Sequence, residues 1–287
     1  TPGRSYTLEQ LRELERYAIK RGVVIVPELD VPGHSAAMVR AMPGWFKGNS
    51  MTINFANPDV REVVDTLIGE MCEVFSATPY FHIGADEVQW GGLAENPHFK
   101  KAMEELEVDE IREIYRDFIV HCNETVKSHG KQTIVWEGFH RGGKVNIPRD
   151  IIVMAFEGGK YYRPDYLLED GYTVINTSWK PLYIVTSRRA PVGQYPVDVI
   201  YGWNMYRFEH MYESRPTPIQ VARDASVLGA QMCSWENKPG SVIPFVRRRL
   251  AAMSERIWNS DMGKFEEFSQ RLRSTDERLN KLVLSVD

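Results

Sequence analysis

Cysteine is scarce in this chain, and what little there is carries no metal or disulfide pattern. Cys72, Cys122 and Cys233 are the three cysteines among 287 residues, and they lie far apart in the sequence. Without a C-x-x-C pair, the sequence excludes a disulfide scaffold and a cysteine zinc site. Long apolar runs are also missing, since none approaches the ~18 residues of a membrane-spanning helix. We therefore expect no membrane partner.

An excess of charge of either sign is absent too. The chain has 35 basic and 39 acidic residues, a net charge of −4, and this balance gives no electrostatic basis for a nucleic-acid partner. Hydrophobic residues make up 43% and charged residues 26%, which excludes a disordered chain. The length suits one α/β barrel of roughly 250 residues, so we expect a single domain over residues 1–287.

Short apolar runs alternate with amphipathic stretches along the chain. Continuously apolar runs of this length are typical of strands that are buried on both faces of a parallel sheet. The predicted strands are Val23–Leu29, Tyr80–Gly84, Gln132–Trp136, Ile151–Phe156, Tyr172–Asn176 and Ala230–Trp235. The predicted helices are Leu8–Arg21, Asp59–Phe75, Asp109–His129, Pro164–Asp170, Thr217–Leu228, Ile243–Asn259 and Lys264–Leu284.

This repeated βα order predicts an α/β fold, and both a doubly wound sheet and a barrel satisfy the alternation. Long loops after the strands, over residues 31–57, 85–108 and 177–216, favour a TIM-type (β/α)8 barrel with a site at the carboxyl ends of its strands. However, the number of predicted strands is six, and the first helix has no strand before it. We therefore expect an incomplete barrel.

Polar residues gather where the first two predicted strands end. Glu28 and Asp30 share one face of the first strand because side chains alternate, and a Pro-Gly turn then leads to His34. The second strand carries His82 and continues into the adjacent carboxyls Asp86 and Glu87. Two carboxyls side by side repel one another, so one tends to keep its proton at neutral pH. General acid catalysis needs such a group.

Simpler explanations exist for each of these residues when it is taken alone. An isolated Asp-Glu pair is usually a solvated loop, and a histidine after Pro-Gly commonly hydrogen-bonds its own loop. A metal site is the main chemical alternative, since Asp and His ligate zinc or manganese. No H-x-H or H-E-x-x-H spacing is present, so we expect neither a metal nor another cofactor.

Seven tryptophans and 13 tyrosines form the unusual part of the composition. Trp136 and Trp235 end predicted strands, and Trp179 and Tyr183 follow another one. Aromatic side chains at the end of a barrel can form the walls of a sugar pocket, although interior packing explains any single one equally well. Trp258 lies on an amphipathic helix, where we expect it in the core.

These residues resemble the catalytic domain of glycoside hydrolase family 20, the β-N-acetylhexosaminidases. The segments that carry the resemblance cover nearly the whole chain in the family's order, and the Pro-Gly-His and His-x-Gly-x-Asp-Glu segments are the most specific. They are Tyr6-Thr7 with its helix, Val26–His34, His82–Glu87, Ile134–Glu137, Gly229–Trp235 and Ala251–Trp258. Relative to the family, this chain lacks the first two barrel strands, so its six strands correspond to strands three to eight and a gap is expected between the first and the last.

The resemblance implies an exo-acting enzyme that removes terminal β-linked N-acetylglucosamine or N-acetylgalactosamine by a substrate-assisted, retaining mechanism. It implies that Glu87 is the general acid and base, that Asp86 holds the acetamido N–H, and that Tyr183 holds the acetamido oxygen. The implied pocket residues are Trp136, Trp235, Trp179, Asn237 and Glu236, and the residues that orient the acid are Asp30, His34, His82 and Glu28. It also implies glycan substrates such as chitooligosaccharides and glycoconjugates, and a secreted, periplasmic or lysosomal-type compartment.

Three positions depart from the family's pattern. Val185 stands two residues after Tyr183, where the family commonly has Asp, and Asn237 stands where it has Glu. Phe156 stands where the family has a further pocket tryptophan. These changes leave open a different class of function, a non-catalytic carbohydrate-binding relative or an inactive fragment of such an enzyme.

Overall fold

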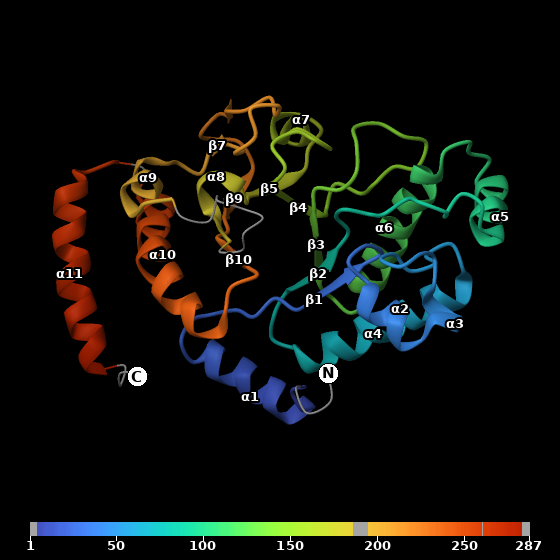
Figure 1. Ribbon diagram of the computed structural model, residues 1–287, viewed down its shortest axis with the longest axis horizontal. Coiled ribbons are helices and arrows are strands. Elements are labelled where there is room, and N and C mark those ends of the chain that lie inside the picture. Colours follow the sequence, from blue (N-terminus) through green and yellow to red (C-terminus); the bar gives the residue numbers. More distant parts are fainter. Residues whose placement is uncertain (1–4, 186–194, 260, 283–287) are drawn as a thin grey trace. The chain divides into compact units, whose positions relative to one another are not determined.

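The computed structural model describes residues 5–185, 195–259 and 261–282 (Figure 1). These residues form two compact units. The first unit extends to Met154 and includes Glu169–Thr173, and the second consists of Ala155–Leu168 and the chain from Val174 onward. The single domain expected over residues 1–287 stays a prediction.

The first unit contains four parallel strands, paired in the order in which they occur in the sequence. Strands β2, β3 and β4 are buried apart from their first residues at most, as the continuous apolar runs predicted, whereas in β1 only Val31 is buried. Because parallel neighbours end at the same edge of a sheet, the loops that follow them begin close together. The strands are β1 (Glu28–Val31), β2 (Tyr80–Gly84), β3 (Gln132–Trp136) and β4 (Ile152–Ala155).

Helices of the first unit begin where the sequence supplies caps. Thr7 and Gln10 form the capping box expected at the start of α1, and Asn57 accepts the N–H of Asp59 at the start of α4. Helix α6 packs against α4, α5 and β3. The helices are α1 (Leu8–Ile19), α2 (Ala36–Ala41), α3 (Pro43–Phe46), α4 (Pro58–Val74), α5 (Pro97–Glu105) and α6 (Ile111–Ser128).

Strands of the second unit pair in three places. Two pairs are parallel, β5 (Thr173–Asn176) with β9 (Val227–Ala230) and β6 (Tyr183–Val185) with β10 (Cys233–Trp235). The third pair is antiparallel and joins β7 (Arg207–Phe208) to β8 (Ile219–Gln220).

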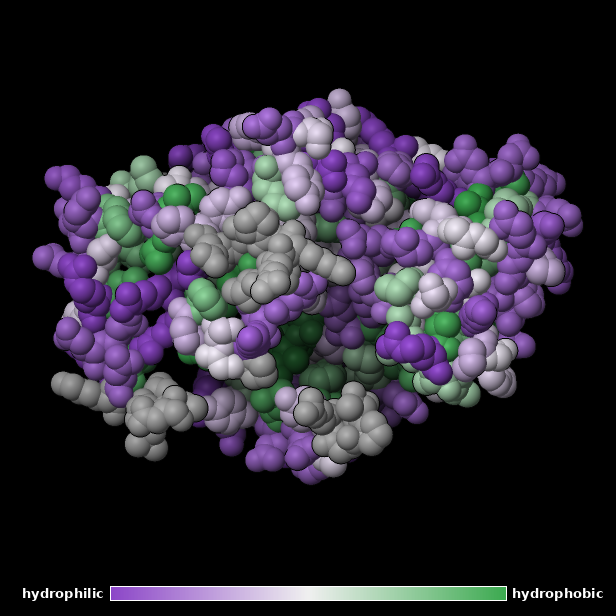
Figure 2. Space-filling model, in the orientation of Figure 1, coloured by the Kyte–Doolittle hydropathy of each residue, from purple (hydrophilic) through white to green (hydrophobic). Residues whose placement is uncertain are grey.

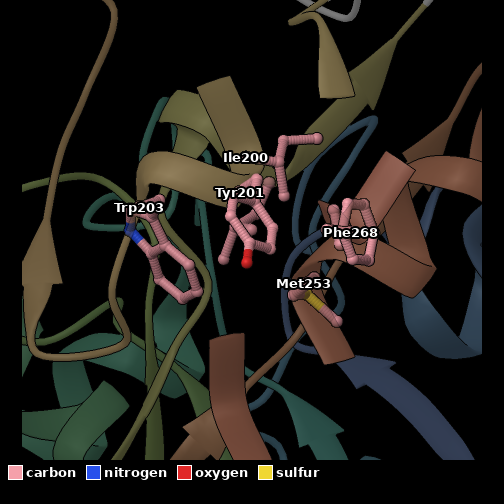
Figure 3. Packing of buried hydrophobic residues seen from close by; sticks show 7 residues of the cluster. Ile200, Tyr201, Trp203, Met253 and Phe268 are labelled. Carbon is pink, nitrogen blue, oxygen red and sulfur yellow. The ribbon is translucent and has the colours of Figure 1, made fainter. Parts of the chain in front are cut away.

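Figure 3 shows the apolar core that holds the helices of this unit together. Tyr201 stacks on Phe268 with 4.6 Å between ring centroids, and Met253 and Trp203 are buried in the same cluster. The helices are α7 (Pro164–Glu169), α8 (Trp179–Leu182), α9 (Val197–Gly202), the 3₁₀ turn Pro239–Ser241, α10 (Val242–Trp258) and α11 (Phe265–Leu282).

One predicted helix, Thr217–Leu228, is wrong. This segment instead supplies β8 and the start of β9, and its amides bond to neighbouring chain segments, such as Val221 N–H to the carbonyl of Tyr206. In the sequence, Pro218 is compatible with the first turn of a helix. A residue without an N–H also fits the position directly before a short strand, which is where Pro218 lies. Pairing with distant segments therefore outweighs the local pattern.

Two strand boundaries and one burial prediction also differ. Strand β1 begins at Glu28 rather than Val23, and the last predicted strand is split into β9 and β10, which pair with different partners.

The predicted burial of Trp258 is wrong, because this side chain is 87% exposed and not part of the core. Figure 2 shows that hydrophobic residues lie among the hydrophilic ones on the surface. None of the helices in the described part of the chain is both long and apolar enough to span a membrane.

Candidate active site

The loops that follow β1 and β2 bring three ionisable side chains together. His34 Nε2 lies 3.5 Å from Asp86 Oδ2 and 3.4 Å from Glu87 Oε2. The Asp86 side chain is 13% exposed and that of Glu87 is 40% exposed, so the first is mostly enclosed and the second opens to solvent. The sequence placed these three residues at neighbouring strand ends, and the structure brings them into contact.

Two glycines permit this close approach. A Cβ on Gly33 would lie 2.5 Å from the carbonyl oxygen of Asp86, and a Cβ on Gly84 would lie 2.0 Å from Asp30 Oδ1. Gly84 also has a φ of +70°, a conformation that glycine adopts without strain. The Pro-Gly-His and His-x-Gly-x-Asp-Glu segments therefore need glycine for steric reasons.

The surroundings of His34 and Asp30 favour the protonated form of both side chains. Hydrogen bonds to Asp86 and Glu87 raise the pKa of His34 to about 10, so the imidazole is positively charged at neutral pH. Burial, together with the negative charge of Asp86, raises the pKa of Asp30 to about 8. A protonated Asp30 and a protonated His34 thus surround the Asp86 carboxylate.

Glu28, His82 and Trp136 of the same unit form a second group of polar contacts. Trp136 Nε1 donates to Glu28 Oε1 at 2.8 Å, and burial raises the pKa of Glu28. His82 Nδ1 accepts the Gly84 N–H at 2.9 Å, and burial lowers the pKa of His82 to about 3. The contact of 3.4 Å between His82 Nδ1 and Glu28 Oε1 is therefore not an ion pair, because this imidazole is neutral.

Trp136 is 3% exposed, so its indole supports Glu28 from within the unit. The role in a sugar pocket that the resemblance implies for Trp136 stays a prediction.

Among the residues that the structure describes, Asp30, His34 and Asp86 have the spacing of a metal site, since their potential ligand atoms lie within 4.8 Å of one another. A metal would have to displace the protons that Asp30 and His34 hold at neutral pH. A chelator tests for a metal at these residues: loss of activity on chelation would indicate one.

Asp30→Asn is expected to stabilise the protein at neutral pH. The folded state keeps the Asp30 proton up to about pH 8, whereas an unfolded aspartate loses it near pH 4. Stability therefore falls as pH rises through this window, and asparagine, which cannot ionise, avoids the loss. We expect the Tm difference between variant and wild type to grow between pH 4 and pH 8, reaching about 2–4 °C for each kcal/mol recovered.

Thermal unfolding at several pH values measures this difference. Asp224→Asn, at an exposed position in the second unit, is the control and should give a pH-independent difference. A gap between Asp30→Asn and wild type that does not widen with pH would show that Asp30 is ionised in the folded protein.

Aromatic residues of the second unit form a stack around Tyr183. Its ring lies 4.1 Å from that of Trp179 and 6.4 Å from that of Phe156, and both pairs are nearly parallel. Tyr183 is 4% exposed and begins β6. Trp179 begins α8 in the preceding loop, so the strand end and the loop together fix the position of the tyrosine ring.

The end of β10 and the loop after it carry the remaining predicted residues. Trp235 pairs with Val185 in the ladder and is 45% exposed. Glu236 is exposed and has a φ of +57°. Asn237 Nδ2 donates to the carbonyl of Ile184 and to Ser234 Oγ, both at 2.8 Å, so its amide group ties this loop to β6.

Two residues of the first unit that the sequence analysis missed anchor the loop after Glu87. Asn49 Nδ2 donates to the carbonyl of Gln89 at 2.6 Å, and Gln89 N–H donates to Thr52 Oγ1 at 3.2 Å. No signal in the sequence links these positions, because they lie about 40 residues apart in separate loops. Their partnership depends on the parallel pairing of β1 and β2.

The chain belongs to glycosyl hydrolase family 20, whose catalytic-domain model matches residues 1–261. This match and a related solved structure confirm the α/β fold and the TIM-type barrel class expected from the sequence. Within the described residues the six parallel strands do not close into a complete barrel, which agrees with the incomplete barrel expected from the strand count. Enzymes of this family are glycosidases.

Relatives of known name agree with this assignment. The chain is 26% identical over 274 residues to the β-hexosaminidase subunit beta of Entamoeba histolytica, covering 88% of this chain and 47% of that one. It is 29% identical over 167 residues to a β-hexosaminidase of Vibrio furnissii, covering 54% and 27%. The first of these relatives is thus about twice as long as this chain.

A solved structure gives the same result. The family 20 exo-β-N-acetylglucosaminidase of Vibrio harveyi, determined in complex with N-acetylglucosamine, matches with a TM-score of 0.79 and 25% identity. The match covers 96% of this chain and 45% of that structure.

Proposed function

We propose that this protein is an exo-acting β-N-acetylhexosaminidase that uses the acetamido group of its substrate as the nucleophile. The observation that supports this most is the Asp86–Glu87 pair at the end of β2, with His34 in contact with both carboxylates. One enclosed carboxylate and one carboxyl open to solvent suit two different roles. Family membership supports the same reaction.

Glu87 is the proposed general acid. In its protonated form it transfers that proton to the glycosidic oxygen while the carbonyl oxygen of the 2-acetamido group attacks the anomeric carbon and the bond to the leaving group breaks. The product of this step is an oxazolinium ion. Glu87, now a carboxylate, removes a proton from water. The water oxygen attacks the anomeric carbon and opens the oxazolinium ring, with net retention of configuration at the sugar.

Asp86 is the proposed partner of the acetamido N–H. A fixed carboxylate next to that nitrogen stabilises the positive charge that develops on the oxazolinium ring, and fixed charges of this kind are typically worth ~3–4 kcal/mol. His34 and the protonated Asp30 hold Asp86 in place, and the neighbouring Glu28 and His82, which contact each other, complete this polar group.

Residues of the second unit are proposed to bind the sugar. Tyr183 would hydrogen-bond the acetamido oxygen, and Trp235 and Trp179 would supply apolar walls. Glu236 and Asn237 would contact sugar hydroxyls. Glycans that end in β-linked N-acetylhexosamine, such as chitooligosaccharides, are the proposed substrates.

The direct test of this function is the release of a chromophore from a β-N-acetylglucosaminide by the intact protein, with and without a chelator. Hydrolysis that survives chelation is expected. A protein that binds the glycoside but releases nothing would be a carbohydrate-binding relative instead.

Trp235→Ala is expected to weaken binding of the terminal sugar by about 1–3 kcal/mol, because burial of apolar area against the indole is lost. The fold should survive, since the side chain is 45% exposed. The inhibition constant of a sugar oxazoline mimic measures the loss. Trp258→Ala, which removes another exposed indole of the second unit, is the control, and equal constants for both variants would place Trp235 outside the pocket.

A further inference from the structure

The chain segment that carries the acid pair has an unusual backbone. Gly84, Ala85 and Glu87 have φ values of +70°, +74° and +45°. Ala85 and Glu87 have side chains, for which this left-handed region is unfavourable. Such a conformation persists only where the surrounding structure holds it.

One of the groups that hold this segment is Tyr115 of α6. Its hydroxyl donates a short hydrogen bond to the carbonyl oxygen of Ala85, and its side chain is 1% exposed. Its ring packs edge-on against Trp90, with 5.7 Å between centroids. The tyrosine therefore connects α6 to the peptide group that directly precedes Asp86.

Gly138 makes room for this connection. A Cβ at this position would lie 2.1 Å from the Ala85 oxygen and 2.6 Å from the Tyr115 hydroxyl oxygen. Helix α6 and the loops after β2 and β3 thus meet at the Ala85 carbonyl. The carbonyl faces Tyr115, while the next two side chains contact His34.

We propose that Tyr115 is a positioning residue for the Asp86–Glu87 pair and acts through the carbonyl of Ala85. The proposal rests on the proposed function for its kinetic consequences but not for its geometry. Without the hydroxyl, the Ala85 peptide group can rotate out of its strained conformation. Asp86 and Glu87 then leave their places relative to the substrate and to His34.

Tyr115→Phe removes only the hydroxyl and tests this directly. We expect kcat on a glycoside with a poor leaving group to fall roughly 10–100-fold, because small misplacements of catalytic groups have effects of this size. A substrate with a strongly activated leaving group needs less help from the acid and should lose less. KM should change less than kcat, since Tyr115 itself is buried and acts on the substrate only through Asp86 and Glu87.

Tyr172→Phe is the matched control in the same unit. Tyr172 is also 1% exposed, and its hydroxyl donates to the carbonyl of Ile147 at 3.1 Å, away from the acid pair. The control should have a comparable Tm loss, an unchanged kcat and the same dependence on the leaving group as wild type. If both variants lose kcat in proportion to their Tm, Tyr115 has only a structural role and the proposal is wrong.

Titration of His34 by NMR gives a readout that does not depend on turnover. In Tyr115→Phe, the pKa of His34 should fall toward an ordinary value, because the two carboxylates that raise it are no longer held near Nε2. An unchanged pKa would overturn the proposal. If the wild-type protein hydrolyses no N-acetylhexosaminide, the proposed function fails while this titration still decides the role of Tyr115.

A second variant serves if Tyr115→Phe does not fold. Gly138→Ala keeps the tyrosine but places a Cβ 2.1 Å from the Ala85 oxygen, which forces that carbonyl away from the Tyr115 hydroxyl. It should show the same selective loss of kcat on poor leaving groups and the same fall in the pKa of His34. Wild-type values for both would also overturn the proposal.

Discussion

Glu87→Gln is expected to abolish hydrolysis of glycosides with poor leaving groups while the variant still binds them. Glutamine has nearly the same shape as glutamate but neither donates a proton to the leaving oxygen nor accepts one from water. General acid or base catalysis typically contributes 10²–10⁴-fold, and we expect a loss within this range for each step that needs it. An activated leaving group departs without protonation, so its release should recover much of the rate.

Steady-state rates on an unactivated disaccharide and on an activated aryl glycoside measure this effect. Glu95→Gln, at an exposed position a few residues further along the same loop, is the matched control and should behave as wild type. Normal hydrolysis of the disaccharide by Glu87→Gln would remove Glu87 from the mechanism.

Asp86→Asn is expected to lower kcat by about 10²–10³-fold, the usual cost of losing one group that stabilises charge in the transition state. In contrast to Glu87→Gln, the loss should be similar for good and poor leaving groups, because Asp86 acts on the acetamido group and not on the leaving oxygen. The pKa of His34 should also fall, since Asp86 makes the largest contribution to raising it.

Kinetics on the same two substrates, with NMR titration of His34, separate these effects. A variant with a lower His34 pKa but undiminished kcat would show that the Asp86 charge serves the local structure and not the reaction. A loss confined to poor leaving groups would instead place Asp86 in the transfer of the proton from Glu87.

Much of this site could be predicted from the sequence because its residues directly follow buried strands. Strand ends that carry Asp30, Asp86 and Glu87 can be found from apolar runs alone, and parallel pairing makes neighbouring ends meet. Pro-Gly before His34 likewise marks a turn. The helices with strong caps, such as α1 and α4, were correct for the same local reason.

Residues whose role depends on distant partners could not be predicted in this way. Tyr115 lies on the buried face of an amphipathic helix, and nothing in its spacing distinguishes a core tyrosine from one that holds a strained loop. Thr217–Leu228 has a helical pattern but forms strand residues, because the pairing partners of β8 and β9 come from elsewhere in the chain.

The exposure of Trp258 is a different case. An amphipathic pattern predicts which face of a helix is apolar, but it does not say which apolar side chains are covered by a neighbour. Trp258 ends α10 and is exposed, whereas Met253, earlier on the same helix, packs in the core.

The central claim, that the acetamido oxygen of the substrate is the nucleophile, is tested most directly by kcat/KM on aryl β-N-acetylglucosaminides whose acetyl group carries zero, one, two or three fluorines. Fluorine withdraws electrons from the carbonyl oxygen and leaves the shape of the sugar almost unchanged. We predict that kcat/KM falls steeply and regularly with each added fluorine. A rate that does not respond to fluorination would mean that an enzyme group or water attacks the anomeric carbon, and it would contradict the substrate-assisted mechanism.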